Sequence, residues 1–104
     1  MKIHENLLNI EKSAPAPYHI IAETYESKPS ITFSYDGLTE RLMRVAIRCL
    51  SRAFRKIVVT NNETGEVIYD RYESDEIFCP TETPTEAIDN CMLQINNYII
   101  NSLA

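Results

Sequence analysis

The stretch that decides the fold is residues 38–55, LTERLMRVAIRCLSRAFR, because it carries the clearest periodicity in the chain. At about 100° per residue, its apolar side chains share one arc of a helix, and they are Leu42, Met43, Ala46, Leu50, Ala53 and Phe54. The arginines fall on the opposite side, and they are Arg41, Arg44, Arg48, Arg52 and Arg55. The pattern predicts an amphipathic helix from residue 38 to about residue 55, with a buried face and a basic face.

A β-hairpin is predicted on each side of this helix. Before it, residues 18–26 are rich in Ile, Thr and Tyr, and residues 31–35 alternate apolar and polar side chains across a turn at 27–30. After it, residues 57–60 are a β-branched run and residues 66–73 alternate again. The loop between these two strands, 61–65, ends in Gly65, which suits a positive φ.

Two further helices are predicted, one at each end of the chain. Residues 3–12 have the spacing of a short amphipathic helix, which Pro15 and Pro17 bring to an end. Residues 84–102 follow a capping-box signature formed by Thr83, Pro84 and Glu86. The apolar stripe of this helix is Ile88, Cys91, Met92, Ile95, Ile99 and Leu103. Leu93 and Ile100 lie off that stripe, and we expect the sheet to bury them, with a homodimer seam as the alternative.

The predicted order is therefore α-β-β-α-β-β-α within one domain, residues 1–104. A chain of 104 residues is one domain's worth of sequence. The simplest way to bury both long apolar stripes is an α+β fold, in which two long helices pack on one face of a four-stranded, mainly antiparallel sheet.

The composition argues against several classes of function. Two glycines leave no glycine-rich phosphate loop, and no hydrolase, zinc-protease or nucleotide-binding motif occurs. Cys49, Cys79 and Cys91 are widely spaced, and neither His4 nor His19 lies at metal-ligand spacing from them. We therefore expect no catalytic residue, no metal and no cofactor, and we expect the protein not to be an enzyme. Cys49 and Cys91 fall on apolar arcs and are predicted core residues, whereas Cys79 lies in a loop.

The predicted location is cytoplasmic. An odd number of cysteines without a disulfide framework favours a reducing compartment. Residues 1–6 lack the apolar core of a signal peptide, and no apolar run approaches the length of about 20 residues that spans a bilayer. We expect no membrane association.

Charge is segregated along the chain, which has a net charge of −5. Residues 36–56 hold six basic residues against two acids, whereas residues 57–104 hold Arg71 against nine acids. The first hypothesis is a small bacterial or mobile-element regulator that inhibits a basic, nucleic-acid-binding protein through an acidic surface. The residues of that surface are Glu63, Glu66, Asp70, Glu73, Asp75 and Glu76.

Other interpretations stay open. The arginines of the central helix match the spacing of phosphates, so a nucleic-acid-binding module is the alternative. A small-ligand or enzymatic domain with an unrecognised site is the second alternative. Both charged regions also have structural interpretations. A solvated helix face, or ion pairs with carboxylates of the same chain or of a partner subunit, would account for the arginines, and solubility together with complementarity to a helix dipole would account for the acids.

Overall fold

The computed structural model describes residues 15–25 and 29–103, and only the backbone of 101–103. Its elements are β1 (Tyr18–Glu23), β2 (Thr32–Leu38), α2 (Glu40–Leu50), β3 (Lys56–Asn61), β4 (Glu66–Tyr72) and α3 (Pro84–Leu103). This order confirms both predicted hairpins and both long helices. The helix predicted over residues 3–12 lies outside the described residues.

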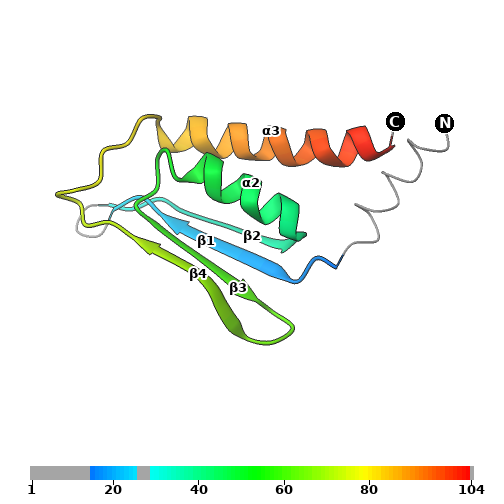
Figure 1. Cartoon of the computed structure of the whole chain (residues 1–104). Helices are drawn as coiled ribbons and strands as arrows, with labels where there is room; N and C mark the ends of the chain where they lie inside the picture. The colour runs from blue at the N-terminus through cyan, green and yellow to red at the C-terminus, as the bar shows by residue number, and fades with distance from the viewer. Residues whose placement is uncertain (1–14, 26–28, 104) are drawn as a thin grey trace.

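The four strands form one antiparallel sheet in the order β2-β1-β3-β4. α2 packs on β1, β2 and β3, and α3 packs against α2. Both helices therefore lie on the same side of the sheet, with α3 running along α2 (Figure 1). The predicted α+β architecture is confirmed.

The hydrophobic core lies between the sheet and the helices. Alternate residues of the two central strands point toward the helices and are buried, because successive side chains of a strand point to opposite faces. The two helices close the core with Leu42, Ala46 and Leu50 from α2 and with Ala87, Cys91 and Ile95 from α3. The buried strand residues form directly opposed pairs, Ile20 with Val59 and Ala22 with Ile57.

A side-chain cap precedes each helix: α3 begins at Pro84, as the sequence predicts, whereas α2 begins at Glu40, two residues later than the predicted start at residue 38. The Thr39 side chain accepts a hydrogen bond from the backbone N–H of Leu42 at 3.2 Å, which satisfies one unpaired amide of the first turn of α2. At α3, the Thr83 hydroxyl accepts from the Glu86 N–H at 3.2 Å, and the Glu86 carboxylate accepts from the Thr83 N–H at 3.2 Å. This reciprocal pair is the predicted capping box.

The predicted ends of α2 and β2 are wrong. α2 ends at Leu50, about five residues earlier than the periodicity predicts, because the chain turns there and the N–H groups of Ala53 and Phe54 both bond to the Leu50 carbonyl. β2 continues through Gly37 to Leu38, although the Asp-Gly pair predicts a strand end. Gly37 has a φ of 80°, and the register shifts beside it, so the glycine forms an irregularity within the strand rather than its end.

The expected burial of Leu93 and Ile100 is also wrong. Leu93 is 58% exposed and Ile100 is 57% exposed. The side of α3 that contacts α2 carries Ala87, Cys91 and Ile95, which are fully buried. Since Leu93 and Ile100 lie on another side of the helix, the sheet does not cover them.

Candidate functional site

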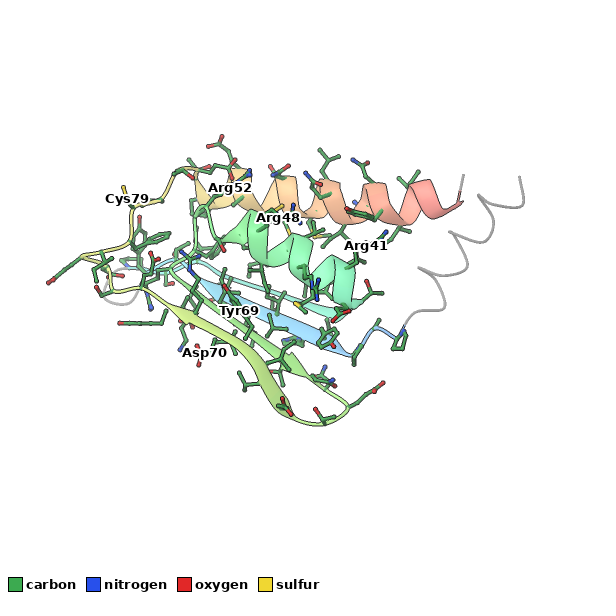
Figure 2. The ribbon with its side chains drawn as sticks, viewed as in Figure 1. Arg41, Arg48, Arg52, Tyr69, Asp70 and Cys79 are labelled. Atoms are coloured by element: carbon green, nitrogen blue, oxygen red, sulfur yellow. The ribbon has the colours of Figure 1, made fainter. Side chains whose placement is uncertain are left out.

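Three arginines project from the exposed side of α2. Arg41, Arg44 and Arg48 are exposed, while Leu42, Val45 and Cys49 of the same helix are buried. The buried face therefore fixes the direction of the arginines, because residues three and four apart share one side of a helix. Figure 2 shows Arg41, Arg48 and Arg52 in succession along α2 and the turn that follows it.

The three arginines line a cleft between α2 and α3. Its volume is about 310 Å³, and its walls are formed by Glu40, Arg41, Arg44, Val45, Arg48 and Tyr98. The Arg41 guanidinium carbon lies 5.6 Å from the centroid of the Tyr98 ring, a cation–π distance that holds this guanidinium in place. An Arg44 guanidinium nitrogen lies 3.4 Å from the Glu40 carboxylate, one helical turn away, in an exposed pair that contributes little to stability.

The cleft has a positive electrostatic balance. Three arginines line it against one acid, Glu40. The wall that α3 contributes adds no charge near Tyr98, because residues 90–103 contain no Asp, Glu, Lys or Arg. Guanidinium groups that line a cleft with this balance are suited to bind an anion, because their donors match the oxygens of carboxylates and phosphates.

Arg52 and Arg55 do not belong to this cleft. An Arg52 guanidinium nitrogen lies 3.8 Å from the Glu82 carboxylate. Arg55 lies outside α2 and is only 4% exposed, so its predicted place on the basic helix face is wrong. Its guanidinium lies 3.3 Å from the Asp75 carboxylate, 3.8 Å from the Glu23 carboxylate, and 5.1 Å from the centroid of the Tyr72 ring.

Arg55 joins the end of the sheet to the loop that follows β4. Its backbone carbonyl accepts a hydrogen bond from the Glu73 N–H at 3.0 Å, while its side chain contacts Asp75. Its Nε and Nη1 atoms are buried without a hydrogen-bond partner. These contacts give Arg55 a structural role, because its guanidinium is itself buried and already has two carboxylate partners, so it is not available to a ligand.

The six acidic candidates are not brought together in one place. Glu63 lies in the turn before β4 and Glu66 is its first residue, whereas Glu73, Asp75 and Glu76 follow its other end, so the length of β4 separates the two groups by about 20 Å. Asp70 lies between the two groups, on β4 (Figure 2). Glu73 pairs with Arg71 at 2.8 Å and Asp75 pairs with Arg55, so two of the six already have ion partners within the chain.

The cysteines lie where the sequence predicts them. Cys49 and Cys91 are buried, whereas Cys79 is exposed in the loop before α3 (Figure 2). Burial raises the pKa of Cys91 to about 12 and also raises the pKa of Cys49, which makes both poor nucleophiles at neutral pH. Within the described residues, no group of three His, Cys, Asp or Glu side chains could hold a metal ion.

The cleft residues that the sequence analysis did not single out are Glu40, Val45 and Tyr98. Tyr98 comes three residues after the buried Ile95, so helical spacing alone places it beside the core. Its position next to Arg41 depends on how α3 lies on α2, which periodicity does not specify. The sequence signal that pointed to this side of the cleft was the absence of charged residues from 90–103, in a chain whose other long helix is rich in arginine.

Comparison of the chain with protein-family models, with curated proteins and with solved structures finds no significant match. In residues 15–25 and 29–103, no helix combines the length and the apolar character needed to cross a membrane.

Proposed function

We propose that this protein is a non-enzymatic binding module that contacts the phosphate backbone of a single-stranded nucleic acid through Arg41, Arg44 and Arg48. The single observation that carries the proposal is the cleft between α2 and α3, which these three arginines line together with Tyr98. Arg44 and Arg48 are four residues apart, a rise of about 6 Å along the helix. Two guanidinium groups at that spacing can contact successive phosphates of an extended strand.

The overall charge of −5 is compatible with this proposal because the effect of distant charges is screened. At physiological ionic strength the Debye length is about 8 Å, so acids at the far end of β4 weakly oppose an anion in the cleft. The local balance at the cleft is two positive charges after Glu40 is counted. We therefore expect modest affinity and weak dependence on sequence, since phosphate contacts carry no base information.

The experiment is fluorescence anisotropy with a labelled single-stranded oligonucleotide at several salt concentrations. Three phosphate contacts predict a slope of about −2 for log K against log salt, at about 0.7 per contact on a single strand. The double variant Arg44→Ala/Arg48→Ala should bind more weakly, with a slope of about −0.7.

The matched control is Arg52→Ala/Arg71→Ala, which removes the same total charge from residues that pair with Glu82 and Glu73. This control should bind as the wild type does. Equal losses in both double variants would mean that total charge, and not the cleft, governs binding, and they would overturn the proposal.

The acidic surface remains the second candidate, with a narrower set of residues. Glu63, Glu66, Asp70 and Glu76 are exposed and have no ion pair with a described residue, so they are available to a basic protein. Reversal of these four residues to lysine tests this candidate without breaking the ion pairs of Glu73 and Asp75. Unchanged affinity for a basic, nucleic-acid-binding partner in that variant would remove the candidate.

A further inference from the structure

The second face of the sheet has no helix on it in the part of the chain that the structure describes. α2 and α3 lie on one side only, so alternate residues of each strand point to the opposite side, which we call the outer face (Figure 1). On the two central strands, the outer face carries His19, Ile21 and Glu23 from β1, and Lys56, Val58 and Thr60 from β3.

The centre of the outer face is apolar and hollowed. Ile21 and Val58 lie directly opposite each other in the strand register, and Ile21 is 40% exposed. A hollow of about 250 Å³ lies over them, lined by Ile21, Glu23, Lys56 and Val58. Ile68 and Tyr72, on β4, add exposed apolar surface. An uncharged centre with a charged edge is the composition of a protein–protein interface.

The apolar centre of the outer face is flanked by one acidic and one basic residue, Glu23 and Lys56. Glu23 lies directly opposite Lys56 in the register. The Glu23 carboxylate lies 3.8 Å from the buried guanidinium of Arg55, and Lys56 has no ion pair with a described residue. The Lys56 ammonium group is therefore available, at the edge of the hollow, to pair with a carboxylate of another chain.

We propose that two copies of this chain pack outer face to outer face, about a twofold axis that runs parallel to the strands between β1 and β3. This operation places β1 of one copy over β3 of the other, and each residue keeps its position along the strand direction. Glu23 then faces the partner's Lys56 and Ile21 faces the partner's Val58, and the same two contacts recur on the other side of the axis because a twofold interface is self-complementary. Aligned sheets pack about 10 Å apart, which lets these side chains fill the two hollows.

The same operation pairs the outer strands without like charges. β2 of one copy lies over β4 of the other, so Ser34 faces the partner's Asp70 and Thr32 faces the partner's Tyr72. The arginine cleft is on the helical side of the sheet and stays open in the dimer. The dimer is thus independent of the proposed nucleic-acid function, and either can fail without the other.

Light scattering after size-exclusion chromatography of the full chain tests the dimer. The wild type should have twice the chain mass of 12.0 kDa at micromolar concentrations. Lys56→Glu should raise the dissociation constant about 10-fold or more, because it places two carboxylates together at each symmetric contact. Glu23→Lys should do the same, and an equimolar mixture of the two variants should restore dimers, since each pair again joins opposite charges.

A further variant is needed as a control, because Glu23 also contacts Arg55 and Glu23→Lys could therefore disturb the fold. Ile21→Lys changes only the centre of the outer face, and it should give a monomer with an unchanged circular dichroism spectrum. A wild-type monomer at micromolar concentrations overturns the proposal. Dimers that persist in Ile21→Lys but dissociate in Leu93→Asn/Ile100→Asn also overturn it, because the contact would then lie on α3.

Discussion

Replacement of Arg55 by methionine should destabilise the fold and leave the arginine cleft intact. The Asp75 carboxylate lies 3.3 Å from the Arg55 guanidinium, which corresponds to a gross attraction of about 5 kcal/mol at an effective dielectric constant of about 20. The cost of burying the guanidinium offsets much of that attraction. Glu23 contributes less, because its side chain is 39% exposed and solvent screens its charge.

Removal of one partner from a buried pair costs about 3–5 kcal/mol, because the other charge is left uncompensated. Since Asp75 and Glu23 both retain some access to water, we expect a smaller loss of about 2–3 kcal/mol for Arg55→Met, at or below the lower limit of that range. This loss should lower Tm by about 8–24 °C for a domain near this size. Methionine keeps most of the length of the aliphatic part of arginine, so the decrease in the free energy of unfolding comes mainly from the loss of the guanidinium group.

Thermal unfolding followed by circular dichroism measures the effect, and Arg52→Met is the matched control. Arg52 is half-exposed and lies 3.8 Å from Glu82, so its removal should cost less than about 1 kcal/mol. Both variants should bind an oligonucleotide as the wild type does. If Arg55→Met is no less stable than Arg52→Met, or if it binds more weakly than Arg52→Met, the structural role assigned to Arg55 is refuted.

Three further predictions concern the cap of α3 and the cysteines. Thr83→Ala should lower the free energy of unfolding by about 1 kcal/mol in urea denaturation, because it removes the cap of α3, whereas Thr85→Ala should be neutral or stabilising. Stability should fall as the pH rises from about 9 toward 12, because the pKa of Cys91 is raised to about 12 in the folded protein and the unfolded chain releases that proton first. Cys91→Ala should flatten this decline. At pH 8 a thiol reagent should modify Cys79 in the folded protein, while Cys91 should react only on unfolding, which peptide mass spectrometry would detect.

Local signals in the sequence were sufficient for most of the elements. The capping box at Thr83 and Glu86 predicted the start of α3, because the interacting groups are three residues apart. The alternating strands and the Gly65 loop predicted the second hairpin. These features depend on nearby residues, so a sequence pattern records them directly.

The features that the sequence did not predict depend on distant residues. The apolar period of α2 continues through Ala53 and Phe54, which are buried, but the chain reaches them by a turn and not by a helix. Arg55 fits the basic face by spacing, yet its partners Glu23 and Asp75 belong to other parts of the chain. Pairings across such sequence distances arise from tertiary packing, which periodicity does not encode.

For the same reason, the sequence predicted the part of the cleft that α2 forms but not the part that α3 forms. Arg41, Arg44 and Arg48 follow from one helical period, and the sequence named all three. Tyr98 completes the site only because α3 lies along α2. In contrast, the acidic candidates are close in sequence but extended along β4, where each residue adds about 3.3 Å and a charge cluster becomes a dispersed row.

The most direct measurement of the central claim is a titration of the isotope-labelled full chain with a single-stranded oligonucleotide, followed by nuclear magnetic resonance. Backbone and arginine side-chain signals report which residues contact the ligand. We expect shifts that concentrate at Arg41, Arg44, Arg48 and Tyr98 and that disappear at high salt. Shifts confined to other surfaces, or no shifts at any ratio of oligonucleotide to protein, would contradict the assignment of this cleft as the binding site.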